Sequence, residues 1–341
     1  MKTFVPFHKI GNQKVTIVDG LHPQNLCFSH WKGANTIREI AADTSGEIVL
    51  NALSVHYTGI ENPLVSATHF DIDGFVGVFA LFYPELALSF KEELIAMARI
   101  GDFREFRPNN ENDDYALKLC CWMNKVEKDK FYRPFENKDE IENCVRKFDF
   151  FLQVFPDVLQ NIDQYKENWE TEYNLVVSGI KFEIKACAYK NIGLVKKEFE
   201  HPSHYYALFN SSEGFDILLA IYPDNRYELE YKYTTWIDLA SRPNLPRVDL
   251  KPLVFDLNQI ETSGYRWKVD SIADTGPIVR LESVELTKAD RFANPSERTI
   301  YSSSISPKNF EDKILSYFSN IYQLIEPKKN WTWSEMRSLN H

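Results

Sequence analysis

The chain has no run of apolar residues long enough to cross a membrane. Its first residues, MKTFVPFHKIGNQ, lack the apolar core of a secretory signal peptide. Its 5 cysteines form no CxxC pair, and an odd number cannot all be joined within one chain. These absences predict reduced thiols, a cytoplasmic location and no membrane partner. They do not predict an oligomeric state.

Positive charge is also scarce, with 39 Lys and Arg against 49 Asp and Glu and a net charge of −10. A protein that binds nucleic acid without sequence preference gains affinity by neutralising phosphates, so this deficit argues against such a partner. A local basic pocket is still compatible with it. Hydrophobic residues make up 44% of the 341 residues, which is enough for sizeable cores. The length predicts two domains.

Three short apolar runs in the first half each end in a polar residue: KVTIVDG at Asp19, NLCFSHW at His30 and LVSATHFD at His69 and Asp71. Runs of this kind are typical of strands buried on both faces of a parallel sheet. Helical patterns lie between and after them. Residues 1–170 are therefore predicted to form an α/β domain with a doubly wound, mostly parallel sheet, whose ligands bind beyond the carboxyl ends of the strands.

The pattern within that half gives specific bounds. We expect an interior strand over 64–69 and a buried helix over 74–83. ELALSFKEELIAMARIG predicts one amphipathic helix that ends at Gly101.

The second half changes to period-two patterns such as IKFEIKACAY, FDILLAIYP and RYELEYKY, separated by turns such as YPDNR. Alternation of this kind predicts strands with one buried face. Residues 171–341 are therefore predicted to form a smaller, β-rich α+β domain with a mixed sheet, which contributes to a cleft with the first domain.

The strongest candidate site is His69-Phe70-Asp71-Ile72-Asp73-Gly74. Alternate residues that leave a strand point the same way, so His69, Asp71 and Asp73 can converge. Close carboxylates repel unless they share a cation, and a mixed His and Asp set suits Mn²⁺, Zn²⁺ or Fe. Alternatively, Asp73 caps the helix, Asp71 is solvated and His69 only ends the strand.

Further metal ligands must come from elsewhere in the chain. Asp102 in RIGDF, Asp19 and His30 are candidates, with His30 also a candidate catalytic residue beside Asp71 and Asp73. Each has a plainer alternative: a residue after a helix end for Asp102, a turn for Asp19 and a structural hydrogen bond for His30.

Two stretches of the second half could bind substrate. His201 and His204 are three apart and would share one face of a helix that began there. Lys232, Arg242 and Arg247 surround a Pro-rich turn, and Arg forks bind phosphate through two parallel hydrogen bonds. We expect this turn to face the acidic residues across a groove. The alternatives are exposed histidines at a helix start, and surface charge on a rigid loop.

Residues 64–85 resemble the first metal motif of the DHH phosphoesterases, in which a strand ends in acidic and His ligands, DG or DA follows and a helix rich in small residues comes next. The resemblance implies an N-terminal doubly wound domain, a smaller mixed C-terminal domain, and a divalent metal, Mn²⁺ before Mg²⁺ or Zn²⁺, that hydrolyses a small phosphorylated substrate. The Asp-His-His triplet of that superfamily is absent. A binding module without catalysis is therefore the alternative.

Most of the chain also resembles a family of uncharacterised bacterial proteins, through stretches such as CFSHWKGANT, HFDIDGFVGVFAL and YRWKVDSI. DIDG is similar as well to the motif of haloacid-dehalogenase-type phosphatases, which would make Asp71 a nucleophile. That family has a Thr where this chain has Phe75. We expect a metal-dependent hydrolase of a phosphate ester or anhydride.

Overall fold

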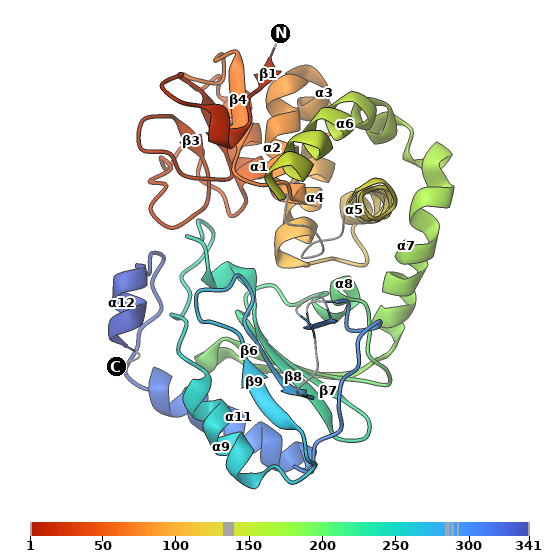
Figure 1. The fold of residues 1–341 in the computed structure, drawn as a ribbon, viewed down its shortest axis with the longest axis vertical. Helices are drawn as coiled ribbons and strands as arrows, with labels where there is room; N and C mark the ends of the chain where they lie inside the picture. Colours follow the sequence, from red (N-terminus) through yellow and green to blue (C-terminus); the bar gives the residue numbers. More distant parts are fainter. Residues whose placement is uncertain (1, 132–139, 284–286, 288–289, 292, 340–341) are drawn as a thin grey trace. The chain divides into compact units, whose positions relative to one another are not determined.

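The computed structural model describes residues 2–131, 140–283, 287, 290, 291 and 293–339 (Figure 1). The chain divides into two compact units, residues 1–174 and 175–341. The division falls inside helix α7 (Lys166–Lys181), whereas the sequence places the boundary at residue 170. Within this part of the chain, no helix is both long enough and apolar enough to span a bilayer.

The first unit contains a four-stranded sheet in the order β1-β4-β2-β3. All of its strand pairs are parallel. The strands are β1 (Thr3–Phe4), β2 (Thr16–Val18), β3 (Cys27–Phe28) and β4 (Leu64–Ala67). An α/β unit with a parallel sheet is therefore confirmed, and the carboxyl ends of its strands lie at one edge.

The predicted strand and buried helix are both present. β4 lies between β1 and β2, and helix α2 (Ile72–Phe82) follows it. The burial expected of both elements is confirmed, because five of their apolar residues are each exposed by 1% or less: Val65, Ala67, Val76, Val78 and Phe79. The helix begins at Ile72, two residues before the predicted start. Asp73 therefore lies in its first turn and not on the connecting loop.

Two glycines let the first helices pack closely against each other and the sheet. Helix α1 (Ser45–Ser54) packs on α2. A Cβ on Gly77 would lie 2.5 Å from Val18 Cγ1, and one on Gly46 would lie 2.8 Å from Val76 Cγ1. Any larger residue would push the two helices and β2 apart, so the small residues of this segment serve packing.

The predicted helix that ends at Gly101 is wrong in two respects. The segment forms two helices, α3 (Pro84–Ser89) and α4 (Lys91–Phe103), and α4 ends in the left-handed residue Arg104. Gly101 lies inside α4, where a Cβ would be 2.5 Å from Ile72 Cβ. The glycine thus serves helix packing and not helix termination. Asp102 consequently belongs to the last turn of α4.

Two longer helices complete the first unit, α5 (Glu111–Lys130) and α6 (Glu140–Gln160). Pro156 lies inside α6, where the sequence suggested a kink or break. Short 3₁₀ turns also occur along the chain. They are η1 (Phe7–Lys9), η2 (Ile162–Tyr165), η3 (Lys190–Ile192) and η4 (Tyr233–Thr235).

The second unit is built on a six-stranded sheet in the order β5-β6-β7-β8-β10-β9. Only the β6–β7 pair is parallel, so the sheet is mixed. The segments IKFEIKACAY, FDILLAIYP and RYELEYKY each contain a strand, as predicted: β5 (Glu183–Tyr189), β7 (Ile217–Tyr222) and β8 (Arg226–Tyr231). The other strands of the sheet are β6 (Leu194–Phe199), β9 (Arg266–Val269) and β10 (Ile278–Glu282).

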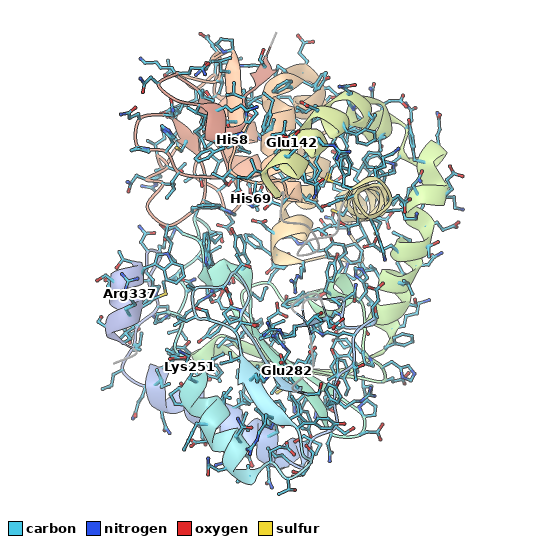
Figure 2. All side chains as sticks on the ribbon, viewed as in Figure 1. His8, His69, Glu142, Lys251, Glu282 and Arg337 are labelled. Atoms are coloured by element: carbon cyan, nitrogen blue, oxygen red, sulfur yellow. The ribbon has the colours of Figure 1, made fainter. Side chains whose placement is uncertain are left out.

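Two helices cover one face of this sheet, α9 (Lys251–Ile260) and α11 (Pro307–Tyr322). Their apolar side chains, such as Leu257 and Phe310, join those of the strands in one core. Figure 2 labels Lys251, the first residue of α9, and Glu282, the last of β10. The structure also describes two short helices in this unit, α8 (Tyr205–Leu208) and α12 (Trp333–Ser338).

Candidate metal centre

Six acidic and histidine residues gather at the carboxyl edge of the parallel sheet. Three follow strands, one caps α2, one lies in its first turn, and one lies in the last turn of α4. They are Asp19 after β2, His30 after β3, His69 after β4, and Asp71, Asp73 and Asp102 on the helices. The strand order brings residues far apart in sequence to one place, as the sequence predicts for strand-end residues.

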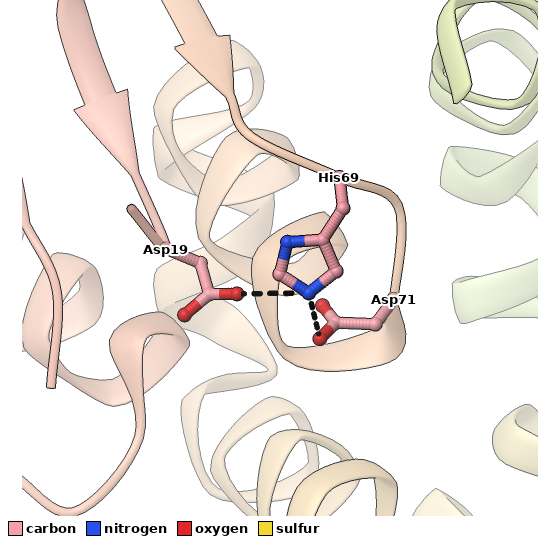
Figure 3. A group of neighbouring side chains, drawn as sticks. All are labelled: Asp19, His69 and Asp71. Carbon is pink, nitrogen blue, oxygen red and sulfur yellow. Dashed lines mark hydrogen bonds and ion pairs between the residues drawn. The ribbon is translucent and has the colours of Figure 1, made fainter. Parts of the chain in front are cut away.

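Three of these residues form an outer group, shown in Figure 3. His69 Nε2 lies 2.9 Å from Asp71 Oδ2 and 3.5 Å from Asp19 Oδ2. One ligand atom from each residue falls within 4.8 Å of the others, a spacing that can hold a metal ion.

An inner group forms around the other imidazole. His30 Nε2 lies 3.4 Å from Asp19 Oδ1 and 3.8 Å from Asp73 Oδ2. The same nitrogen lies 3.4 Å from Asp102 Oδ2. Asp19 therefore joins the two groups, because one of its oxygens faces His30 and the other faces His69.

Both imidazoles are held with Nε2 directed at carboxylates. His30 Nδ1 lies 2.6 Å from the backbone oxygen of Asp43, which can only accept a hydrogen bond. The Thr68 hydroxyl donates to the backbone oxygen of Asp19 and must therefore accept from His69 Nδ1. In both residues the Nδ1 position carries the proton. This is the second-shell arrangement that leaves Nε2 as the ligand atom of metal-binding histidines.

Backbone and hydroxyl donors orient the carboxylates. Asp73 accepts from Ser45 N at 2.8 Å and Gly46 N at 2.7 Å, so it caps α1 from a neighbouring helix. Ser45 Oγ donates to Asp19 Oδ1 at 2.8 Å. Asp71 Oδ1 accepts from Gly74 N at 2.8 Å and is the N-cap of α2. The sequence alternative that gives this cap to Asp73 is therefore wrong, because the helix starts earlier.

Burial differs sharply between the two groups. Asp19, His30 and Asp73 are buried, with 0–3% of each exposed. In the outer group, 45% of the His69 side chain and 33% of the Asp71 side chain are exposed. A substrate or water can thus approach from the side of His69 and Asp71, while the inner group is shielded.

The pKa values reflect this crowding. Burial raises the pKa of Asp73 to about 7; the charge of His30 acts to lower it, and the charges of Asp19 and Asp71 act with burial to raise it. Burial, together with the charges of Asp73, Asp71 and Asp19, raises the pKa of Asp102 well above its usual range.

In the two histidines and Asp19, neighbouring charges and hydrogen bonds outweigh the effect of burial on the pKa. Burial lowers the pKa of His30, but its bond to Asp19 and the charges of Asp73 and Asp19 raise it to about 9. Burial also lowers the pKa of His69, while the charge and hydrogen bond of Asp71 raise it to about 10. Burial would raise the pKa of Asp19, yet the two histidines lower it. Positive charge at this site is strongly favoured.

The donor set fits divalent cations. When all four carboxylates are ionised, as metal ligands would be, their charge of −4 equals that of two divalent ions with opposite sign, and imidazole with carboxylate suits Mn²⁺, Fe or Zn²⁺. Asp102 Oδ2 is a buried carboxylate oxygen with no hydrogen-bond partner among residues 2–131, 140–283 and the later described positions. Such an oxygen, aimed at His30 Nε2, is suited to a cation ligand.

The basic residues predicted to bind substrate have partners within the second unit. Arg247 is fully buried and donates to Thr235 Oγ1 and to the backbone oxygens of Ile272, Asp274 and Thr275. Arg242 forms a bidentate pair with Asp216, and Lys232 Nζ donates to the Ser212 backbone and hydroxyl oxygens. These contacts brace the loops of that unit. The expected approach of this turn to the acidic residues stays a prediction.

His201 and His204 do not share a helical face, so that expectation is wrong. Helix α8 begins at Tyr205, with His204 as its N-cap and His201 outside it. His204 is buried, and its Nδ1 accepts from Tyr206 N at 3.2 Å. A role for either residue in substrate binding stays a prediction.

Three supporting residues escape the sequence reasoning. Ser45 and Thr68 hold Asp19, Thr68 also holds the His69 imidazole, and the Trp31 ring lies 5.9 Å from the His69 ring. Ser45 stands in the stretch DTSGE, whose small polar residues are typical of a helix start and give no sign of a contact with Asp19. Trp31 directly follows His30, and an aromatic next to a candidate ligand was its one signal.

Fold and site together define an α/β protein with a buried cluster of carboxylates and imidazoles at the carboxyl edge of a parallel sheet. The chain belongs to DUF6687, a family of unknown function whose model matches residues 1–329. No curated protein and no solved structure matches it.

Proposed function

We propose that the first unit binds two divalent cations, Mn²⁺ before Mg²⁺ or Zn²⁺, and hydrolyses a phosphate ester or anhydride. The observation that carries this proposal is the position of Asp19. Its Oδ2 lies 3.5 Å from His69 Nε2 and its Oδ1 lies 3.4 Å from His30 Nε2. A carboxylate that faces two separate imidazoles in this way suits a ligand shared between two ions.

The remaining residues divide between the two ions. His69 and Asp71 would hold the outer one, and His30, Asp73 and Asp102 the inner one. Hydrogen bonds from Ser45, Gly46 and Gly74 to the carboxylates, and from His69 Nδ1 to the Thr68 hydroxyl, fix the ligands in advance. Preformed ligands of this kind reduce the reorganisation that binding requires.

Paired ions supply a water of lowered pKa and a clamp for phosphoryl oxygens. The protein makes the outer and inner groups differ in their exposure to solvent. Partly exposed His69 and Asp71 leave the outer group open to a phosphate and a water, whereas buried His30 and Asp73 hold their charge away from solvent. Burial strengthens electrostatic interactions there. Asp71 lies on the side of the centre that is open to solvent, and Asp73 and His30 lie on the shielded side. Because all three border the same centre, we expect each of them to act in the reaction.

The test is Mn²⁺ titration of metal-depleted protein, followed by assays with bis(p-nitrophenyl) phosphate and inorganic pyrophosphate. Wild-type protein should bind about two ions per chain, the number expected of a shared-carboxylate centre. Asp19→Asn should weaken both ions, because Asp19 belongs to both groups. Asp102→Asn should weaken only the inner one.

Asp129→Asn is the matched control, because Asp129 is an exposed residue of α5 that pairs with Lys125. It should leave binding and turnover unchanged. Binding of a single ion by wild-type protein would overturn the two-ion proposal. Tight binding of two ions without turnover of either substrate would favour the alternative of a binding module.

A further inference from the structure

A cavity of about 560 Å³ lies in the first unit beside the edge strand β3. Its volume is within the range of about 300–1,000 Å³ that small-molecule sites occupy. Apolar side chains make much of its wall, and polar residues such as Asn35 and Thr36 complete it. The apolar ones include Leu21, Leu26, Phe28, Ile37, Ile40 and Tyr57.

The cavity is bounded by the two loops that leave the metal centre. Leu21 comes two residues after Asp19, and Gly33 comes three residues after His30. Since a residue extends the chain by at most about 3.6 Å, the Cα atoms of these pairs are separated by no more than about 7 and 11 Å. A small ligand could therefore contact the cavity and the acidic groups together.

The edge strand offers a donor and an acceptor to this cavity. Ile17 N donates to Leu26 O and Asp19 N donates to Phe28 O, so Leu26 and Phe28 direct their backbone groups toward β2. In a parallel strand, the intervening Cys27 must direct its N–H and C=O outward. Among the described residues neither group has a hydrogen-bond partner. The Cys27 side chain is turned into the 22–26 loop, where Sγ accepts from His22 N.

We propose that this cavity binds a planar nitrogen heterocycle, a nucleobase, and that the phosphate of the same nucleotide reaches the acidic centre. Only the approach of the phosphate to the acidic centre rests on the proposed function. An adenine places a ring-nitrogen acceptor beside an amino donor, which matches the adjacent N–H and C=O of Cys27. The apolar walls would enclose its two faces, as stacking surfaces do for bases.

Other occupants fit less well. A fatty chain would bury the Cys27 N–H and C=O without partners, at a cost of about 1–3 kcal/mol per group. β3 has only 2 residues, which is too short to pair with an added peptide strand. A nucleobase uses both the apolar walls and the polar edge.

The experiment measures binding of adenosine to metal-depleted full-length protein by calorimetry, with uridine and ribose as comparisons. Ile37→Trp and Ala34→Phe should each fill the cavity and weaken adenosine binding by at least about tenfold, or 1.4 kcal/mol. Leu88→Trp is the matched control, since Leu88 is 38% exposed against 43% for Ile37 and does not line the cavity. Its affinity should equal that of the wild type.

Asp71→Asn separates this inference from the proposed function. It should lose the outer ion and keep adenosine binding. Adenosine binding by wild-type protein that turns over neither bis(p-nitrophenyl) phosphate nor pyrophosphate in the presence of Mn²⁺ would count against the hydrolase and support the cavity assignment. No adenosine binding by wild-type protein, equal binding of ribose, or unchanged affinity in both Ile37→Trp and Ala34→Phe would overturn the inference.

Discussion

At the scale of single residues, the hydrogen bonds of the imidazole Nδ1 atoms are as informative as the contacts of Nε2 with the carboxylates. The Thr68 hydroxyl lies 3.0 Å from His69 Nδ1 and donates to Asp19 O. Thr68→Val keeps the shape and removes both contacts, so His69 can change tautomer. We expect Mn²⁺ affinity to fall about 10–100-fold, the usual effect of losing an outer-shell partner. Calorimetric titration measures it.

The control for this change is Thr16→Val. Thr16 is buried on β2, and its hydroxyl donates to the backbone oxygen of Gly59, away from the metal centre. It should cost stability without changing Mn²⁺ affinity. Equal affinity losses in both variants would mean that Thr68 acts only through the fold.

Asp71 has two roles that can be separated by substitution. Its Oδ1 caps α2 through Gly74 N, and its Oδ2 faces His69. Asn is as good an N-cap as Asp, so Asp71→Asn should abolish tight binding of the outer ion and change the apo protein's unfolding free energy by no more than about 2 kcal/mol.

Asp71→Ala should lose the cap as well and be less stable than Asp71→Asn by about 1 kcal/mol. Chemical denaturation with and without Mn²⁺ distinguishes the two losses. If Asp71→Asn unfolds the protein in the absence of metal, Asp71 is chiefly a structural residue.

At the scale of elements, Glu261 joins the end of α9 to the 303–304 segment. Burial would raise its pKa, but hydrogen bonds from Ser303, from the Ser304 N–H and hydroxyl, and from Ser263 lower it to about 2. A carboxylate with a depressed pKa in the folded state stabilises the fold above its unfolded pKa of about 4.3 and loses that contribution as the pH falls toward 2.

Glu261→Gln should therefore be less stable than the wild type at pH 7 by about 1 kcal/mol, because the site is partly open to solvent. The difference should shrink between pH 4.5 and 2. Urea denaturation at several pH values measures it. A difference that stays constant over this range would show that the charge of Glu261 contributes nothing.

The helices and strands were easier to predict than the contacts between their side chains. The apolar run before His69 and the small residues after Asp73 sufficed for β4 and α2, because both are buried on all sides. The helix end predicted at Gly101 was wrong because this glycine makes room for Ile72. In the sequence it cannot be told apart from a glycine that ends a helix. Asp19 and His30 each follow an apolar run in the sequence, which correctly predicted their position at the carboxyl edge of the sheet.

Pairings set by tertiary contact left no local signal. Nothing near Ser45 indicates that its hydroxyl meets Asp19, 26 residues away. A basic residue such as Arg247 is expected at the surface, and its burial depends on carbonyl oxygens from a distant loop. Periodicity records which face is buried but not which polar groups meet there.

At the scale of the whole molecule, all six proposed ligands belong to the first unit, residues 1–174. A ligand that binds only the folded state stabilises it by about 2.7 kcal/mol at a concentration of 100 Kd. Local opening of segments that hold the ion should be suppressed by a similar amount, while segments that do not hold it keep their own opening equilibria. Mn²⁺ should therefore act unevenly along the chain.

Hydrogen exchange followed by mass spectrometry tests this expectation. Mn²⁺ should slow exchange in peptides that cover β2, α1, β4 and the start of α2, and leave those from β5 to β8 unchanged. Asp19→Asn should abolish the protection, because it removes the ligand that the two groups share. Equal protection across both units would place the Mn²⁺ contacts outside this centre, since an ion held by Asp19 and its neighbours touches only the first unit.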